Sequence, residues 1–355
     1  MSLKRIGRIA AAIAAFASAA ALAGPAAIGF IEAERFATLP DGVRFPEGIT
    51  ANPSTGDIFV ATFDFGPVSN KLVRLDASGR VSAIRDFGGT PLLGLEFARN
   101  KVYILNFGAS KLQRIAANFG PGTPVEDVAS IPSIGSSGSR SEPNPDGSSD
   151  LVTFGSSGFP APNAMAFDAD GNLYISDSFQ GAIFEVANAA TCARPCPVTL
   201  VSHDPLLATA GTPPFGANGL AFSADGKTMY IANTGDHRVL AMDMATKAIS
   251  VFSISLHGAD GLLFDRGSGL LWVATNQADH VVALDAQGRI VLKAGEFLGV
   301  GADGSPQGLL FPASLVISGG SMYVTNLALP LTPAPGDEPE DFVTRWTVSR
   351  FALPR

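Results

Sequence analysis

Four residues with side-chain oxygens stand at the same place in a repeated sequence pattern. The segment "NGLAFSADGKTMYIAN" begins at Asn218, and related segments begin at Glu47, Asn163 and Asp260. Two carboxylates and two amide carbonyls, without His or Cys, suit a hard cation if they converge, and Ca²⁺ accepts mixed oxygen ligands at flexible geometry. The pattern predicts a site for one divalent cation, with Ca²⁺ expected and Zn²⁺, Mg²⁺ or Mn²⁺ as alternatives.

A simpler interpretation of these residues is also open, because Asn-Gly and Asp-Gly pairs commonly form the turns that precede strands. That interpretation does not account for Glu47, since Glu is not a turn former. It also does not explain why polar residues recur at one register of the repeat. A cation site explains both observations, so we expect the four side chains to meet.

The repeat indicates which elements must position these residues. Each unit contains two short strand-like runs split by a turn, as in "GLAF", "SADGK" and "TMYIA", with further strand-like runs behind them. The six units that align on their first runs begin at Glu47, Leu93, Asn163, Asn218, Asp260 and Ala313. Such units, at roughly 55 residues each, are typical of propeller blades. The sequence predicts an all-β, six-bladed β-propeller with the six first positions, and the metal, in its central channel.

One propeller domain is predicted over residues 24–355. The longest interval between units contains the Ser/Gly/Pro-rich run "PSIGSSGSRSEPNPDGSSD" and is expected to hold a loop insertion at about 118–160, rather than a seventh blade. The last unit is one strand short if "FVTRWTVSRFAL" is its third strand. The N-terminal "GFIEAERFATL" can supply the missing strand and close the ring.

A second polar ring is expected near the same face. The ends of the six second strands carry Thr62, Asn106, Asp177, Asn233, Thr275 and Asn326. These residues either cap the strand ends or orient the ligands of the cation from a second layer.

The N-terminus has the pattern of a secretory signal. Lys4, Arg5 and Arg8 precede an apolar run of about fourteen residues that ends in "ALAG". We expect residues 1–23 to be removed, which makes the mature chain periplasmic or secreted, without stable membrane insertion. An uncleaved anchor is the alternative, but the run is short and Ala-rich for a helix that spans a bilayer.

Charge and cysteine content limit the partners and the compartment. The formal net charge is −8 and no Lys/Arg cluster follows the N-terminus, which argues against nucleic acid and favours a small-molecule substrate. The two cysteines, Cys192 and Cys196 in "CARPC", are expected to form a disulfide in an oxidising compartment. A metal site there would lack a second Cys or His pair at ligand spacing.

With these residues identified, the chain resembles the senescence marker protein (regucalcin)/gluconolactonase-like family of six-bladed propellers, and more distantly the paraoxonases and strictosidine synthases. The resemblance is carried by "FPEGI" around Glu47, "PNAMAFDADGNLYISD" around Asn163, "ANGLAFSADGKTMYIAN" around Asn218 and "ADGLLFDRGSGLLWVA" around Asp260. It implies that these four residues hold a catalytic divalent metal. It also implies hydrolysis of a lactone or related ester, in which the metal polarises the carbonyl while water attacks.

The resemblance also raises the question of the general base. Asp260 is one candidate, because the matching Asp of the family has been considered as a base as well as a ligand. His257 is the second candidate, because an imidazole titrates near neutrality. His237 and His280 occupy equivalent "DHxV" turns. Each His can equally be a surface turn residue, since sequence position fixes no hydrogen-bond reach.

One departure from the family bears on the substrate. Sugar-lactone members place an Arg two residues before the Asn that matches Asn163, and here that position is Ala161. The loops expected on the metal face carry Phe63, Phe65, Phe107, Phe159, Phe179 and Phe215. Some of these can be core residues, but together they indicate a substrate more apolar than an aldonolactone. The predicted pocket comprises Phe63, Asn106, Phe107, Ala161, Asp177, Phe179, Asn233 and Asn326.

The sequence therefore favours a secreted, metal-dependent hydrolase of a lactone or related ester, with Asp260 and His257 as candidate catalytic residues. The alternative is a non-enzymatic propeller that binds a ligand or a protein and holds a structural metal, because one fold hosts many functions. A synthase that forms carbon-carbon bonds is a third interpretation, but that chemistry does not need all four metal ligands.

Overall fold

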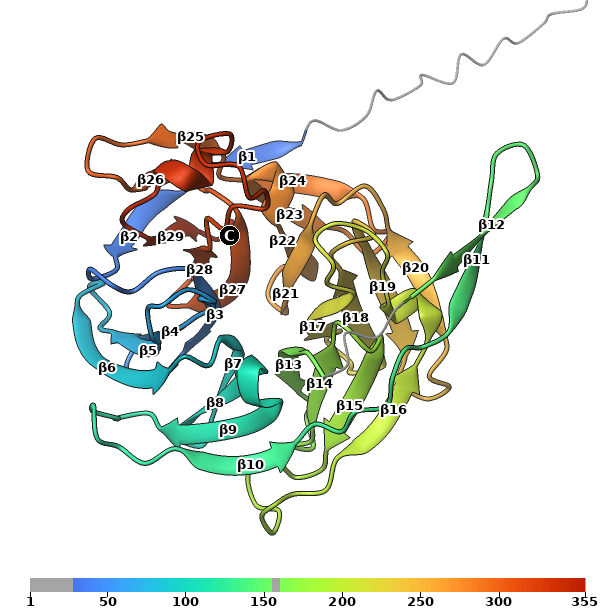
Figure 1. Ribbon diagram of the computed structural model, residues 1–355, viewed down its shortest axis with the longest axis horizontal. Coiled ribbons are helices and arrows are strands. Elements are labelled where there is room, and N and C mark those ends of the chain that lie inside the picture. The colour runs from blue at the N-terminus through green and yellow to red at the C-terminus, as the bar shows by residue number, and fades with distance from the viewer. Residues whose placement is uncertain (1–27, 155–159, 355) are drawn as a thin grey trace, which may run out of the picture.

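Six β-sheets are arranged as blades around a central axis (Figure 1). The computed structural model describes residues 28–154 and 160–354, so the predicted signal sequence at 1–23 and Phe159 lie outside the described residues. Neighbouring strands within a blade are antiparallel, with one exception described below. The prediction of an all-β, six-bladed propeller is confirmed.

The first three blades follow one another along the chain. Blade 1 comprises β3 (Pro46–Ala51), β4 (Ile58–Thr62), β5 (Asn70–Leu75) and β6 (Val81–Gly88). Blade 2 comprises β7 (Leu92–Ala98), β8 (Lys101–Asn106), β9 (Lys111–Ala116) and β10 (Glu126–Ser130). Blade 3 comprises β13 (Pro162–Phe167), β14 (Leu173–Asp177), β15 (Ala182–Val186) and β16 (Thr199–His203).

The other three blades complete the ring. Blade 4 comprises β17 (Ala217–Phe222), β18 (Thr228–Asn233), β19 (Arg238–Asp243) and β20 (Ile249–Ser253). Blade 5 comprises β21 (Ala259–Asp265), β22 (Leu270–Thr275), β23 (His280–Leu284), β24 (Ile290–Ala294) and β1 (Gly29–Ile31). Blade 6 comprises β27 (Pro312–Ser318), β28 (Ser321–Asn326), β29 (Thr347–Ala352) and β2 (Glu34–Thr38).

Short elements connect the blades. Two hairpins, β11 (Ser139–Pro143) with β12 (Ser149–Thr153) and β25 (Phe297–Val300) with β26 (Pro306–Gly308), stand outside the blades. In the part of the chain that the structure describes, four 3₁₀ turns lie in loops: η1 (Phe107–Ala109), η2 (Pro205–Leu207), η3 (Asn276–Ala278) and η4 (Pro339–Phe342).

The N-terminal segment closes the ring. Strand β2 pairs antiparallel with β29 and becomes the outer strand of blade 6, which confirms the predicted closure. Strand β1, just before it, pairs parallel with β24 and adds a fifth strand to blade 5. The segment therefore bridges the two blades, and each of its strands covers an edge that would otherwise be exposed.

The interval predicted as a loop insertion at about 118–160 is more structured than expected. It contains β10, the outer strand of blade 2, and the hairpin β11–β12, which projects from the body beside blades 3 and 4 (Figure 1). The hairpin has no fully buried residue. Its strands therefore lack the hydrophobic alternation that reveals a strand in sequence. Arg140 anchors its base, donating to Asp236 Oδ2 and to the Pro205 carbonyl, both at 2.8 Å.

The hydrophobic core is divided among the blade interfaces. Tyr103 and Phe184 belong to the cluster between blades 2 and 3, and Trp272 and Phe351 belong to the cluster between blades 5 and 6. Because both faces of a blade pack against neighbours, the second strands are buried on both sides, and β4 is buried at every position. Apolar residues therefore run continuously in such strands instead of alternating.

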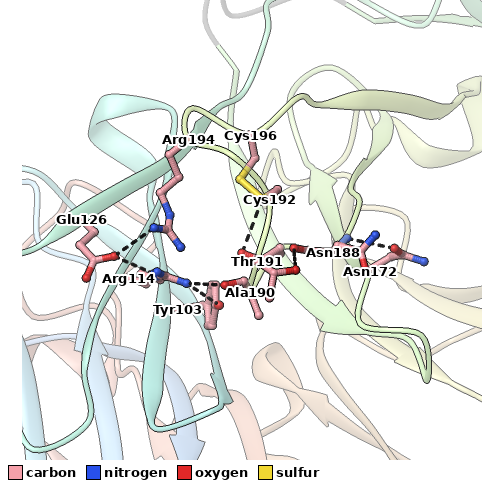
Figure 2. Close-up of a disulfide and its surroundings, with 11 residues drawn as sticks. Tyr103, Arg114, Glu126, Asn172, Asn188, Ala190, Thr191, Cys192, Arg194 and Cys196 are labelled. Carbon is pink, nitrogen blue, oxygen red and sulfur yellow. Dashed lines mark hydrogen bonds and ion pairs between the residues drawn. A yellow bond between two sulfur atoms is a disulfide. The ribbon is translucent and has the colours of Figure 1, made fainter.

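The predicted disulfide is present, and its loop joins two blades (Figure 2). Cys192 and Cys196 are bonded in the loop between β15 and β16. The Cys196 N–H donates to the Val128 carbonyl of β10 at 2.8 Å. Arg194 pairs with Glu126 at 3.5 Å, on the same strand (Figure 2). The stapled loop of blade 3 thus packs against the outer strand of blade 2.

Replacing both Cys192 and Cys196 with serine is expected to destabilise the protein by about 2 kcal/mol, the chain-entropy value for so short a loop. Denaturant unfolding of the variant and of the wild type under oxidising conditions measures the difference. Thiol titration of unfolded, unreduced wild type should find no free sulfhydryl. A variant as stable as the wild type would show that the contacts to Val128 and Glu126 suffice without the covalent bond.

Candidate metal centre

The four candidate ligands lie at one register of the inner strands, inside a local irregularity that recurs in every blade. The strand pairing of β3 with β4 shifts between Pro46 and Ile49, which encloses Glu47. The same shift occurs around the other five first positions, in β7, β13, β17, β21 and β27. A bulge re-aims the side chain that it contains. Repetition of the bulge therefore gives all six first positions the same local geometry.

Glycines directly after several of these positions allow neighbouring inner strands to approach closely, and they do not form turns. A Cβ added to Gly48 would lie 2.2 Å from the Leu93 carbonyl oxygen, and one added to Gly219 would lie 2.2 Å from that of Asp260. Such contacts leave no room for a side chain. Since Asn218 and Asp260 themselves lie within strands β17 and β21, their Asn-Gly and Asp-Gly pairs are not turns that precede strands.

The four side chains are buried and leave oxygen atoms without partners. Glu47, Asn163, Asn218 and Asp260 are each at most 5 % exposed. Among buried side-chain atoms of the described residues, Glu47 Oε2, Asn163 Oδ1 and Asp260 Oδ1 have no hydrogen-bond partner. Buried polar atoms in native proteins are normally paired, so each of these oxygens needs an explanation. Coordination of a hard cation would satisfy all three.

Residues one position beyond the predicted second ring hold the ligands in place. The amide groups of Asn163 and Asn218 donate to Ser178 Oγ and Thr234 Oγ1, both at 2.9 Å. These bonds occupy Nδ2 of each amide. Asn276 donates from Nδ2 to Asp260 Oδ2 at 3.1 Å. The three partners occupy equivalent places, directly after β14, β18 and β22.

The predicted second ring has a different role, and this corrects the orienting interpretation. Asn106 caps η1, and Asn233 donates to the carbonyls of Leu206 and Ala208. The remaining members, Thr62, Asp177, Thr275 and Asn326, likewise bond to nearby loop or strand groups. Alternate residues of a strand face opposite sides, so a shift of one residue moves the side chain away from the ligands. The place of Asn106, Asp177, Asn233 and Asn326 in a substrate pocket stays a prediction.

A cluster of phenylalanines covers the ring on the face where the inner strands begin. This aromatic cap consists of Phe63, Phe65, Phe107, Phe179 and Phe215. Phe63 contacts Phe107 with ring centroids 5.4 Å apart. Both pack in one apolar cluster with Leu93 and Ala313, the apolar members of the first ring, and with the buried Ala161. The cap is therefore in direct contact with the ring that contains the candidate ligands.

The electrostatics of the site favour a cation. Burial raises the pKa of Glu47 well above its ordinary value, and the charge of Asp260 raises it further. Burial also raises the pKa of Asp260 to about 7, although hydrogen bonds from Asn276 and Asn218 oppose the shift. Two neighbouring buried carboxyl groups are costly to ionise together. A bound cation would offset this cost, so it is strongly stabilised at such a site.

The ligand set is also specific in its chemistry. In the described part of the chain, no three His, Cys, Asp or Glu side chains gather closely enough to hold a metal. A metal site at the ring must therefore combine the two carboxylates with amide oxygens. Mixed carboxylate and carbonyl oxygens fit Ca²⁺ better than zinc, which prefers nitrogen and sulfur ligands.

Two of the histidines considered as bases, His237 and His257, lie on loops beside blades 4 and 5. His257 is exposed, and its ring centroid is 5.2 Å from that of His237. His237 Nδ1 accepts a hydrogen bond from the Gly258 N–H at 3.0 Å, so a neutral His237 carries its proton on Nε2. His280 begins β23, where burial lowers its pKa and the nearby Lys293 contributes. Asp260 is thus the candidate base that lies in the ring itself.

Sequence reasoning missed Asn276. It is 2 % exposed, its Nδ2 holds Asp260, and its Oδ1 is another buried atom without a partner within the described residues. Gly258 is required beside it, because a Cβ there would meet Asn276 Oδ1 at 1.7 Å. One signal in the sequence could have revealed it. Asn276 is a polar residue directly after a second strand, and Ser178 and Thr234 occupy the equivalent positions in their blades.

Comparisons with known proteins agree with the propeller fold. The model of the SMP-30/Gluconolactonase/LRE-like region matches residues 212–294, which include Asn218 and Asp260. No curated protein matches the chain significantly. Among solved structures, a calcium-binding regucalcin from Agrobacterium tumefaciens is similar, with 17 % identity, a TM-score of 0.60, and coverage of 92 % of this chain and 97 % of that one.

Two further structures share the fold. A luciferin-regenerating enzyme is 16 % identical, with a TM-score of 0.60 and coverage of 88 % of this chain and 92 % of that one. A gluconolactonase from Xanthomonas campestris is 14 % identical, with a TM-score of 0.54 and coverage of 89 % and 88 %. The family model over residues 212–294, together with the shared propeller fold, confirms the resemblance of this chain to the SMP-30/gluconolactonase-like family.

Proposed function

We propose that the protein is a metal-dependent hydrolase of an apolar lactone or related ester. One observation carries the proposal: Glu47, Asn163, Asn218 and Asp260 occupy one register of the inner strands, buried, with unpaired oxygens on three of them. Their carboxylate and amide oxygens are the donor set that a hard cation needs. We propose Ca²⁺ as this cation.

The residues of the chain have separable roles in this proposal. A bound divalent cation would supply electrophilic stabilisation of the negative charge that develops on the carbonyl oxygen of the substrate. Ser178 Oγ accepts from Nδ2 of Asn163, which leaves Oδ1 of that amide available, and Thr234 Oγ1 accepts from Nδ2 of Asn218. Asn276 holds Oδ2 of Asp260 and leaves Oδ1 to coordinate the cation, so Asp260 can act as a base only where its carboxylate moves away from the cation. His257 remains the second candidate base.

The aromatic cap supplies the substrate wall. Phe63, Phe107 and Phe179 present phenyl edges and faces beside the ring of candidate ligands. Ala161 occupies the position where sugar-lactone enzymes place an Arg. Burying apolar area against phenyl rings stabilises a complex, whereas phenyl rings offer sugar hydroxyls few hydrogen-bond partners. We propose that an alkyl or aryl group of the substrate packs on this cap.

Export is part of the proposal. The charged start and short apolar run at residues 1–23 and the disulfide between Cys192 and Cys196 both suit an oxidising compartment outside the cytoplasm. Across residues 28–154 and 160–354, no helix has the length and apolar character to cross a membrane.

Catalytic efficiency is expected to be higher on an alkyl-substituted lactone than on gluconolactone. The alkyl group would bury apolar area against the cap, which has no guanidinium to hydrogen-bond sugar hydroxyls. The preference should be roughly tenfold or more, the value of one or two buried methylenes. Measuring kcat/KM on a lactone panel, each with and without a chelator, tests both parts of the proposal. Retention of full activity in chelator would exclude metal dependence.

Phe65→Ala provides a matched test of the cap, since this ring is 66 % exposed and packs on Phe63 at 4.7 Å. It should raise KM for the alkyl lactone and leave KM for gluconolactone nearly unchanged. A clear preference of the wild type for the sugar would refute the apolar wall. Absence of activity on every lactone, with the cation bound, would favour a ligand-binding propeller instead.

A further inference from the structure

Six apolar side chains line the central channel directly behind the candidate ligands. Each stands two residues after one of the six first positions, and together they form an apolar ring: Ile49, Leu95, Met165, Leu220, Leu262 and Leu315. Every member comes from a different inner strand and is at most 8 % exposed. Such side chains offer a metal ion no oxygen ligand. The apolar ring therefore separates the candidate metal centre from the part of the channel beyond it.

A cavity of about 720 Å³ occupies that part of the channel, at the end opposite the aromatic cap. The apolar ring forms the inner end of this far cavity. Two residues further along four of the inner strands, its wall carries half-buried phenyl rings from four consecutive blades: Phe97, Phe167, Phe222 and Phe264. Small-molecule sites have volumes of roughly 300–1,000 Å³ and predominantly apolar walls. The far cavity can therefore hold the apolar body of an organic molecule.

One carboxyl group interrupts this wall. Glu96, on β7, is half-buried and lies in the sequence between a member of the apolar ring and Phe97. The equivalent positions of the other five inner strands carry no charge: Thr50, Ala166, Ala221, Leu263 and Val316. Burial raises the pKa of Glu96 to about 7, a backbone hydrogen bond from Phe97 opposes the shift, and no charge of the described residues contributes to it. A cation bound beside Glu96 would stabilise its ionised form.

The remaining charged residues of the far cavity lie at its open end. Asp168 and Asp265 accept hydrogen bonds from backbone N–H groups within their own turns. Asp170, Arg99 and Arg266 are exposed. With the carboxyl group on β7, the wall carries four carboxylates against two guanidinium groups. A concave wall with an excess of negative charge favours a positively charged ligand.

We infer that the far cavity binds a small organic cation, with its apolar body against the four phenyl rings and its ammonium group beside the Glu96 carboxylate. A protonated amine on an alkyl or aryl skeleton is the chemical class that fits, because phenyl faces attract ammonium groups as well as apolar atoms. This site lies on the other side of the apolar ring from the candidate metal centre, so the inference does not depend on the proposed function.

Fluorescence titration with dansylcadaverine tests the inference, because this probe joins an aromatic group to a protonated amine and its emission rises in apolar surroundings. We expect saturable binding with the same Kd in calcium and in chelator. The N-acetylated probe, which lacks the charge, should bind about tenfold more weakly, the value of one hydrogen bond to a charged group. Glu96→Gln should remove this difference between the probes. Glu32→Gln, at an exposed position, is the matched control and should retain it.

Two further variants locate the probe. Phe167→Leu trims the wall of the far cavity and should weaken binding of both probes several-fold, because less apolar area is buried. Phe65→Ala, in the aromatic cap, should change neither Kd. Weaker binding in Phe65→Ala alone would place the probe on the cap and overturn the inference. Equal affinity of the wild type for both probes, or tighter binding of the carboxylate probe dansylglycine, would also overturn it, and this comparison needs no variant to fold.

Discussion

Asp260→Ala should reduce hydrolysis by roughly 10³-fold or more, the scale of losing one electrophilic stabiliser in an active site. The substitution removes a buried carboxylate of the ring and also the acceptor of Asn276. Single-turnover and steady-state kinetics on the best lactone substrate measure the loss. Asp150→Ala, on the exposed strand β12, is the matched control and should retain full activity.

Asp260→Asn separates coordination from proton transfer. It keeps an oxygen ligand but removes the negative charge and the proton acceptor. We expect the variant to bind calcium more weakly. If its kcat at saturating calcium is as low as that of Asp260→Ala, Asp260 acts as a base. A kcat restored by excess calcium would assign it to coordination alone and direct attention to His257. Turnover by Asp260→Ala at the rate of the wild type would refute the proposed site.

Removing the cation should produce the largest change in stability. A ligand that binds only the folded state at a thousand times its Kd stabilises that state by about 4 kcal/mol. For a chain of this size we expect a rise in Tm of roughly 5–10 °C on adding calcium and the reverse on adding a chelator. Differential scanning calorimetry, together with metal analysis of the purified protein, measures both quantities.

The pH dependence of this effect follows from Asp260. Its pKa is about 7 in the folded, metal-free protein and lower in the unfolded chain. The proton that it binds therefore stabilises the fold at low pH, and this contribution is lost as pH rises through about 7. Calcium displaces that proton, so the calcium-induced rise in Tm should be larger at pH 8 than at pH 5.5. A shift independent of pH would place the bound ion elsewhere, and a protein with neither bound cation nor shift would exclude the site.

The repeat made the architecture predictable from sequence. Six aligned units predict six blades, because each first strand must occupy the same place around the axis. The register of Glu47, Asn163, Asn218 and Asp260 followed from the same alignment, since equivalent positions in a symmetric ring share one height. The pairing of Cys192 with Cys196 needed only composition and compartment.

The direction in which each side chain points could not be predicted from the repeat. The predicted second ring, including Asn233, was one residue from the side chains that touch the ligands, because strand pleat and the end of each strand are set by pairing with neighbours. Asn276 had no motif of its own, and its contact with Asp260 depends on how blade 5 closes.

Sequence alone determined which residues could bind a cation and that six blades would bring them to one level, because both follow from local composition repeated along the chain. Only the tertiary structure decided the environment on either side of that level. Phe63, Phe107 and Phe179 come from different blades, and they meet in one cluster only because the blades close into a ring. Apolar cover, desolvation and pKa depend on neighbours distant in sequence, and only packing of the blades brings those neighbours together.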